Sequence, residues 1–255
     1  DKVKRVLKSF KINAHVLTWK GKKPINNIQA LARNKRYEFL FSKCKKLKIS
    51  NLVLGHNLDD LIENFFLRIA RGSGLKGLVS LGMKTQIKDI YFIRPLIKFE
   101  KKDLLFISKF IFNFHVDDPS NHDVKFNRIK IRNLIKEFND FGLDKKKFQL
   151  TIENLKGSDQ SIKFYVEKNK RENLTFNNRK VELILKENFF DNSHEVIFRS
   201  LSDLIHLVGK KANFVRGRKI ENILNKIKER KLRKETLGGC VIKMVNHTVI
   251  LTKEQ

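Results

Sequence analysis

Four residues that could bind a cation lie within one short segment of the chain. They are His56, Asp59, Asp60 and Glu63, in the stretch Gly-His-Asn-Leu-Asp-Asp-Leu-Ile-Glu. In a helix that begins near residue 58, acids of the first turn gain roughly 0.3–1 kcal/mol each from the helix dipole, which accounts for Asp59 and Asp60. Glu63 is explained less well, because like charges three or four residues apart cost about 0.2–0.5 kcal/mol per pair. The cluster therefore favours a site for a metal ion or an ammonium group over simple helix capping.

The segment that carries these residues has the pattern of a strand followed by a helix. An apolar run predicts a buried strand over 51–55, and apolar residues at steps of three and four predict a helix over 58–71. Ligands of open α/β sheets bind at the carboxyl ends of strands, so the junction between the two elements is a candidate site. A glycine beyond the helix, Gly72 or Gly74, is expected to end it in the left-handed conformation.

Strands and helices alternate through the first half of the chain. The other elements expected there are a helix at 1–10, a strand at 14–19, a helix at 28–46, a strand at 90–97 and a helix at 100–113. This alternation predicts an α/β fold with a parallel sheet.

The second half is predicted to hold basic helices and a small α/β module. The pattern is helical and very basic from 124 to 170, and the polar stretch 172–179 is expected to join two domains. The last elements expected are helices at 195–208 and 217–231 and strands at 239–245 and 247–252, with a hairpin turn at Asn246-His247.

The composition indicates a polyanionic partner and argues against a membrane protein. Lys and Arg number 55 against 27 Asp and Glu, which gives a formal net charge of +28 and a pI of about 10.1. Such a charge favours nucleic acid as a partner, although a chain this rich in Lys, Asn, Ile and Phe can owe part of it to compositional drift. No apolar segment approaches the roughly 18 residues of a spanning helix. No signal peptide is visible, and the two cysteines, Cys44 and Cys240, form no C-x-x-C motif, so we expect a cytoplasmic protein.

Several arginines are candidates for phosphate contacts. Arg36 lies in the expected helix 28–46, beside Arg33, and either belongs to a solvated basic face or neutralises a phosphate by a bidentate contact. Arg128 and Arg132 are four residues apart, on one face of a helix that follows the polar turn 118–121. Two arginines so placed suit contact with an RNA backbone or a triphosphate.

The order of these motifs resembles the tRNA(Ile)-lysidine synthases, a family of PP-loop ATP-pyrophosphatases. The matching segments are Ala32-Arg33-x-x-Arg36-Tyr37, Gly55-His56-x-x-Asp59-Asp60-x-x-Glu63, Arg68-x-x-Arg71-Gly72-Ser73-Gly74-Leu75-x-Gly77-Leu78, Arg94-Pro95-Leu96, Asp118-Pro119-Ser120-Asn121, Arg128-x-x-x-Arg132 and Thr236-Leu237-Gly238-Gly239-Cys240. The H-x-x-D-D-x-x-E element is shared with other PP-loop enzymes, whereas the whole ordered set is specific.

The resemblance implies a fold and a division into domains. It implies an α/β PP-loop catalytic domain at 1–138, a basic helical extension at 139–172 and a tRNA-binding α/β domain at 173–255. The family's nucleotide-binding loop, Ser-Gly-Gly-x-Asp-Ser, and its first strand do not occur in this sequence, and we expect them upstream of Asp1 in a longer protein. The alternative, a protein that has lost catalysis, stays open.

The resemblance also implies a reaction and the residues that perform it. ATP would adenylate C2 of the wobble cytidine in a tRNA(Ile) with a CAU anticodon, and L-lysine would then displace AMP. The implied catalytic residues are Arg36, Asp60, Glu63 and Arg128, of which Asp60 and Glu63 would bind lysine. Arg36, His56, Arg128 and Arg132 would contact ATP, and Asp59 is the candidate ligand for Mg²⁺. A membrane partner is not implied, and a homodimer is compatible with the resemblance.

Two other readings compete with this interpretation. A sibling PP-loop enzyme such as a tRNA thiolase would need clustered cysteines, and Cys44 and Cys240 are far apart in sequence. A non-catalytic RNA-binding protein would explain the charge and the missing loop, but not why Asp59, Asp60 and Glu63 are retained.

Overall fold

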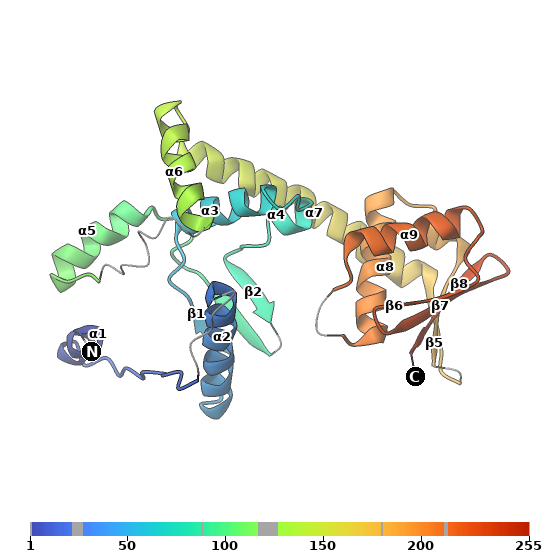
Figure 1. The fold of residues 1–255 in the computed structure, drawn as a ribbon, viewed down its shortest axis with the longest axis horizontal. Coiled ribbons are helices and arrows are strands. Elements are labelled where there is room, and N and C mark those ends of the chain that lie inside the picture. The colour runs from blue at the N-terminus through green and yellow to red at the C-terminus, as the bar shows by residue number, and fades with distance from the viewer. Residues whose placement is uncertain are drawn as a thin grey trace. The chain divides into compact units, whose positions relative to one another are not determined.

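The computed structural model describes residues 2–21, 28–87, 89–116, 127–179, 181–211 and 214–254, without the side chains of 28–30, 127, 128 and 139. The chain divides into two compact units, Asp1–Leu155 and Lys156–Gln255. Helix α7, Lys145–Asn173, begins in the first unit and continues into the second (Figure 1). The expected division into 1–138, 139–172 and 173–255 stays a prediction. None of the described helices combines the length and apolar character that a membrane crossing requires.

The described sheet of the first unit contains one parallel strand pair. Its strands are β1 Asn51–Val53, β2 Lys84–Ile87 and β3 Ile90–Ile93. β3 lies between the other two, parallel to β1 and antiparallel to β2. The parallel pair confirms part of the expected sheet, and β2 is a strand that the sequence analysis did not predict.

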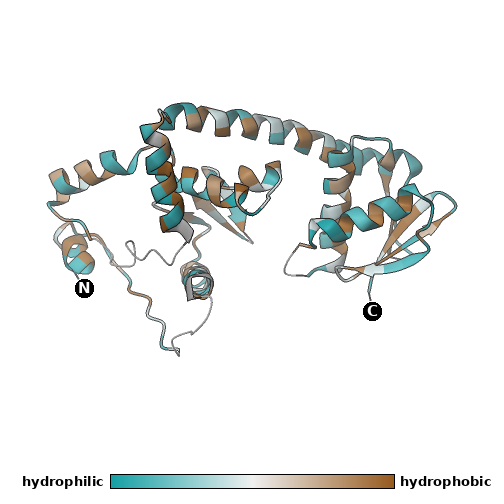
Figure 2. Ribbon diagram, turned by 45° about the horizontal axis from the view of Figure 1, so that its top comes forward, coloured by the Kyte–Doolittle hydropathy of each residue, from teal (hydrophilic) through white to brown (hydrophobic). Residues whose placement is uncertain are grey.

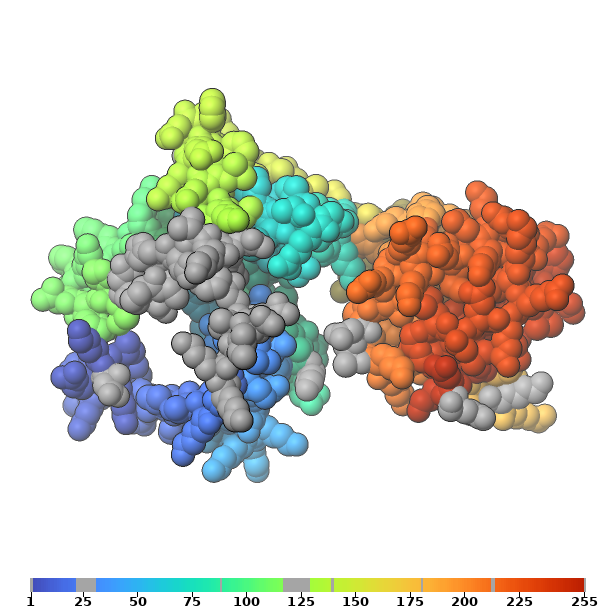
Figure 3. Space-filling model, viewed as in Figure 1, coloured from blue at the N-terminus to red at the C-terminus, as the bar shows by residue number. Residues whose placement is uncertain are grey.

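Helices account for most of the remaining first unit. They are α1 Lys2–Ser9, α2 Ile28–Lys46, α3 Leu58–Ile69, α4 Leu75–Leu78, α5 Lys101–Phe112 and α6 Asn127–Asp140. Phe41 of α2 packs edge-on against Phe92 of β3, with ring centroids 5.7 Å apart. The apolar face of α3 forms a second cluster with Ile135 of α6 and Ile152 of α7. α6 lies directly against α3, as Figures 1 and 3 show.

Two expectations about the first unit are wrong. The stretch 14–19 forms no strand, because no strand among the described residues offers it a hydrogen-bonding partner. β1 was expected to be buried, yet Val53 is 63% exposed. Leu52 and Leu54 pack toward α2, so Val53 between them faces the opposite side of the sheet, which the described residues leave open.

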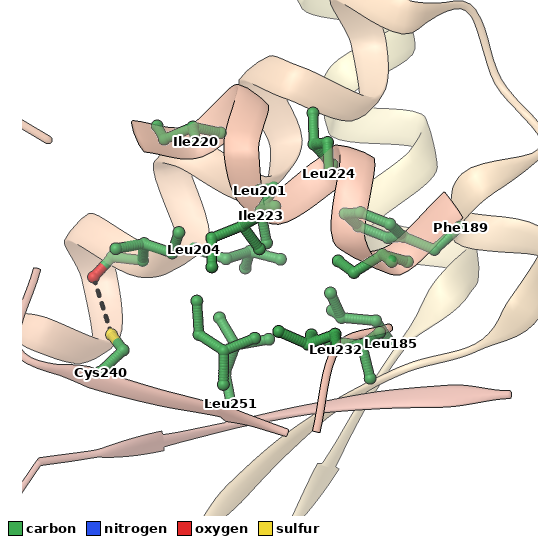
Figure 4. Packing of buried hydrophobic residues seen from close by; sticks show 14 residues of the cluster. Leu185, Phe189, Leu201, Leu204, Ile220, Ile223, Leu224, Leu232, Cys240 and Leu251 are labelled. Carbon is green, nitrogen blue, oxygen red and sulfur yellow. Dashed lines mark hydrogen bonds between the residues drawn. The ribbon is translucent and has the colours of Figure 1, made fainter. Parts of the chain in front are cut away.

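The second unit is an antiparallel sheet with helices on one face. Its strands are β4 Leu174–Asn177, β5 Glu182–Leu185, β6 Lys234–Leu237, β7 Cys240–Val245 and β8 Thr248–Lys253, in the spatial order β4-β5-β8-β7-β6. The helical elements after β5 are η2 Glu187–Phe190, α8 His194–Gly209 and α9 Gly217–Lys228. Figure 4 shows leucines of the sheet, Leu185 and Leu251, pointing toward Leu204 of α8 and Ile223 of α9. This shared apolar core holds the module together.

Two tight hairpins explain the glycines and the polar turn near the end of the chain. Gly238 and Gly239 join β6 to β7 with φ of +64° and +82°. Asn246 and His247 join β7 to β8 with φ of 45° and 62°, which confirms the predicted hairpin. The expected linker at 172–179 is wrong, because these residues end α7 and form β4, which pairs with β5.

Candidate active site

The start of α3 is built by a reciprocal cap. Asn57 is the N-cap residue, and its side chain accepts a hydrogen bond of 3.1 Å from the Asp60 backbone N–H. Asp60 Oδ2 in turn accepts a hydrogen bond of 3.1 Å from the Asn57 backbone N–H. This capping box satisfies two amides that a helix start leaves without partners. Among the described residues no group bonds to the second oxygen, Asp60 Oδ1. That oxygen is the acceptor that Asp60 offers to a ligand.

The end of α3 also follows the sequence. Gly72 has φ +65°, and its N–H donates to Ile69 O at 2.8 Å. The Ser73 N–H donates to Arg68 O at 3.0 Å, and the two bonds together form a Schellman motif. Of the two glycines expected to end the helix, Gly72 does so, and Gly74 instead begins α4.

Glu63 is paired with Arg132 of α6. Arg132 Nε lies 2.5 Å from Glu63 Oε1, and Nη2 lies 3.3 Å from Oε2, so the contact is bidentate. The Glu63 side chain is only 6% exposed, against 31% for Arg132. The hydrogen bond that Arg132 donates to Glu63 raises the pKa of Arg132 despite partial burial of the guanidinium. The sequence analysis named both residues as site candidates but did not predict that they touch.

Asp59 joins the starts of three helices. Its Oδ1 accepts a hydrogen bond of 2.7 Å from Lys145 Nζ of α7, and its Oδ2 accepts one of 2.7 Å from the Lys101 N–H at the start of α5. Lys145 Nζ also lies 3.5 Å from Glu100 Oε2. Burial raises the pKa of the Asp59 carboxyl, but the Lys145 and Lys101 hydrogen bonds outweigh burial and hold that pKa below its ordinary value.

Asp59 does not fit Mg²⁺ in this arrangement. Mg²⁺ requires oxygen ligands in near-octahedral geometry, and both oxygens of Asp59 already accept short hydrogen bonds. In the part of the chain that the structure describes, no three His, Cys, Asp or Glu side chains gather as metal ligands. The cations beside the acidic cluster are instead the chain's own Arg132 and Lys145.

The remaining predicted residues lie on three different elements. His56 is half-buried in the loop between β1 and α3. Arg36 is exposed on α2, one turn from Arg33, whose guanidinium carbon lies 5.6 Å from the Tyr37 ring centroid. Arg128 lies on α6 four residues before Arg132, and its side chain falls outside the described ones. The predicted turn 118–121 lies outside the described residues altogether.

Arg94 is a functional candidate that the sequence analysis quoted within a motif but gave no role. It follows β3 directly and is 5% exposed. Its Nη1 donates hydrogen bonds of 2.9 Å each to Gly82 O and Thr85 Oγ1. The Arg-Pro step after an apolar strand was the available signal, because an arginine next to a buried strand can be buried itself, and buried arginines are usually paired.

The cysteines have structural surroundings. Cys44 is buried in the first unit, and Cys240 is buried in the second. The Cys240 thiol donates to Ile205 O at 3.1 Å (Figure 4), and burial raises the pKa of that thiol to about 11. Cys240 is therefore a protonated packing residue at neutral pH.

Comparison with known proteins places this chain in a family. The family model for the PP-loop domain matches residues 1–138. The tRNA(Ile)-lysidine synthase of Wolbachia sp. subsp. Brugia malayi (strain TRS) is 30% identical over 261 residues, covering 98% of this chain and 57% of the relative. That of Orientia tsutsugamushi (strain Boryong) is 30% identical over 265 residues, covering 100% of this chain and 59% of the relative. The chain thus spans less than two thirds of the length of these relatives.

A solved structure was also matched, the U34-tRNA thiolase NcsA from Methanococcus maripaludis. It is 16% identical with a TM-score of 0.46, covering 60% of this chain and 52% of that chain, and a likeness this distant carries no argument. The match over residues 1–138 shows that this chain belongs to the PP-loop family, and the relatives it matches at about 30% identity are tRNA(Ile)-lysidine synthases.

Proposed function

We propose that this protein takes part in the ATP-dependent ligation of L-lysine to C2 of the wobble cytidine of a tRNA(Ile) with a CAU anticodon. One observation carries the proposal. Asp60 and Glu63 lie at the start of α3, at the carboxyl end of β1, in a chain whose relatives are lysidine synthases. Carboxylates so placed suit an ammonium substrate, and membership of the PP-loop family implies the use of ATP.

The proposed reaction has two steps. The C2 carbonyl oxygen of cytidine attacks the α-phosphorus of ATP, and the bond to pyrophosphate breaks. The ε-amine of lysine then attacks C2, and AMP leaves with the pair of electrons from the C2–O bond. The ammonium must first lose a proton, which an adjacent carboxylate can accept. Mg²⁺ on the nucleotide would offset the phosphate charge, and no described residue is assigned as its ligand.

Asp60 is the lysine contact that this arrangement favours. Its Oδ1 bonds to no other group among the described residues, while Oδ2 holds the helix cap in place. Glu63 is engaged by Arg132, so it would bind the ammonium only after that guanidinium moves. Arg36 and Arg128 are proposed to contact the α-phosphate. Arg132 and His56 are proposed to contact other parts of the nucleotide. If Glu63 takes part, lysine binding and the release of Arg132 are coupled.

The basic helix α7 is proposed to contact the tRNA. Phe164 and Tyr165 are 63% and 53% exposed, with ring centroids 5.5 Å apart. They line a surface hollow of about 420 Å³ together with Gly157, Gln160 and Ser161. Lys168 lies one turn away and is exposed. Exposed aromatic rings beside lysines suit the stacking of unpaired RNA bases.

The test is lysine incorporation by the natural protein. We expect labelled lysine to enter a tRNA(Ile) transcript with a CAU anticodon, dependent on ATP, and not a transcript whose wobble cytidine is replaced. Asp60→Asn should lower the rate at least about tenfold, which is about 1.4 kcal/mol of transition-state stabilisation, with tRNA affinity near normal. Asp103→Asn, on the exposed surface of α5, is the matched control. Absence of incorporation by the unmodified protein would refute the proposal.

The second candidate is a non-catalytic RNA-binding protein. The net charge of +28 favours it, since such a charge supports RNA contact without any chemistry. The same assay separates the two functions. Salt-dependent tRNA binding without ATP-dependent lysine incorporation would establish the second one.

A further inference from the structure

Arg94 is a buried cation that has no acidic partner among the residues that the structure describes. It is 5% exposed, and its Nε is buried without a hydrogen-bond partner, while Nη1 makes its two bonds to neutral oxygens. No described Asp or Glu acts on its pKa, which burial lowers. Buried charges in proteins are paired, because desolvation without a counter-charge is costly. The described chain supplies no anion for Arg94, which makes this guanidinium a candidate partner for an anionic ligand.

A second guanidinium, that of Arg33, acts on Arg94 electrostatically. Arg33 stacks over Tyr37 at 5.6 Å, and Tyr37 packs edge-on against Phe92 of β3 at 5.5 Å. Phe92 is two residues before Arg94 and therefore points to the same side of the strand. The like charge of Arg33 adds to burial in lowering the pKa of Arg94, against an opposing effect of Tyr37. Arg33 and Arg94 are thus linked through the rings of Tyr37 and Phe92, and no described acid acts on the pKa of Arg94.

The position of this pair is where an α/β protein binds ligands. Arg94 follows the last residue of β3, and the Leu54 N–H after β1 donates to Ile93 O at 2.8 Å. β1 and β3 are parallel, so both strands end at the same edge of the sheet. α3, with its acidic start, begins four residues after Leu54. Ligands of open α/β sheets bind at this edge.

We propose that Arg94 and Arg33 form a binding site for a phosphate group. A guanidinium binds a phosphate or carboxylate through two parallel N–H···O hydrogen bonds, and the edge that carries Nε can supply such a pair of donors. The two positive charges of the guanidinium groups match the double negative charge of a terminal phosphate. A single carboxylate would neutralise only one of the two guanidinium groups. A nucleotide and an RNA backbone both present such oxygens. The site holds whether or not the protein transfers lysine, since it requires only a phosphate-bearing ligand.

The first experiment measures the midpoint of the thermal transition that unfolds the first unit, while sodium pyrophosphate replaces sodium chloride at constant ionic strength. A ligand that binds only the folded state raises the midpoint with concentration, and polyvalent anions also stabilise proteins non-specifically. Arg33→Met should therefore lose the specific part of the rise. Lys45→Met removes the same charge from the exposed end of α2 and is the matched control.

The second experiment identifies the source of the phosphate by calorimetric binding of pyrophosphate and of a tRNA transcript. Arg94→Lys keeps the positive charge but removes the paired guanidinium donors. The site is assigned to a nucleotide if both Arg33→Met and Arg94→Lys lower the affinity for pyrophosphate tenfold or more. Loss of tRNA affinity alone, with a log–log salt slope reduced by about 0.9, assigns it to one backbone phosphate. Arg33→Met that matches Lys45→Met for both ligands overturns the proposal, even if the Arg94 variant does not fold.

Discussion

The sequence analysis named Asp59 as a candidate ligand for Mg²⁺, whereas in the structure Asp59 binds the Lys145 ammonium group. Asp59→Ala removes the acceptor for the Lys145 ammonium and for the Lys101 N–H, each 2.7 Å away. Lys145→Met removes the ammonium and leaves the bond to Lys101. The two variants and their combination form a double-mutant cycle that isolates the ion pair.

The expected magnitude comes from the partial burial of the pair. The side chains of Lys145 and Asp59 are 23% and 25% exposed, so the pair lies between an exposed one, worth about 0.2–1 kcal/mol, and a buried one. We take about 1 kcal/mol for the pair. A hydrogen bond to a charged group contributes about 1.5–3 kcal/mol, which for the Lys101 N–H we place at the lower end. Asp59→Ala should therefore cost about 2–3 kcal/mol and Lys145→Met about 1 kcal/mol.

Hydrogen exchange of backbone amides is the suitable assay, because two units preclude a single unfolding free energy. The Lys101 amide is in the first turn of α5, where Asp59 is its acceptor. Its protection should fall in Asp59→Ala and persist in Lys145→Met. Lys146→Met is the control, since it removes the same charge from the first turn of α7 without an ion pair among the described side chains.

The pH dependence has a definite sign. The folded-state pKa of Asp59 lies below its ordinary value of 3.8, so its stabilisation is present above that value and is lost as pH falls through the folded pKa. The difference between the unmodified protein and Asp59→Ala should be largest near neutrality and shrink below about pH 4. If Asp59→Ala leaves Lys101 protection intact but abolishes Mg²⁺ dependence of activity, the structural role of Asp59 is refuted.

Three further outcomes are expected. Glu63→Gln should lower the free energy of unfolding of the first unit by about 2 kcal/mol at pH 7, measured by exchange of α3 and α6 amides, because Arg132 loses its charged partner. Phe164→Ser should weaken tRNA binding by about 1–3 kcal/mol in a filter-binding assay, while the control Ile162→Val, at a half-buried position of the same helix, should not. The Cys240 thiol, with a pKa of about 11, should react with iodoacetamide at pH 8 roughly 200-fold more slowly than a free cysteine, and unfolding should abolish the difference.

Elements with strong local patterns could be predicted from sequence. The helix expected at 28–46 is α2, and those expected at 58–71 and 100–113 are α3 and α5 with slightly shorter bounds. Their apolar periodicity and their caps are local properties, so neighbours in sequence determine them. The turn at Asn246-His247 was predictable for the same reason, since only few residue types accept two successive positive φ values.

Elements that depend on distant partners were not predictable. The stretch 14–19 has β-forming residues but no partner strand, whereas β4 arises in the polar stretch 172–179 because β5 pairs with it. β-propensity mostly expresses how a side chain packs against its neighbours in a sheet, so composition alone misjudged both segments. Figure 2 shows apolar and polar residues following one another along α7. The sequence predicted that this basic helical stretch ends at residue 170, and α7 ends three residues later, at Asn173.

The spacing of the acidic residues predicts which carboxylates share a helix start, but not which distant residues pair with them. The helical spacing placed Asp59 and Asp60 in the first turn of one helix, as the structure shows, and the metal ion or ammonium group expected from the excess negative charge stays a prediction. The cations that the structure brings there lie 69 and 86 residues away in sequence, in Arg132 and Lys145. With Asp59 and Glu63 neutralised from within the chain, Asp60 Oδ1 is the remaining acceptor among the described contacts of these three residues. An ammonium substrate therefore either binds at Asp60 alone or displaces Arg132 from Glu63. The second route predicts that Arg132→Met tightens lysine binding, and the first predicts no change.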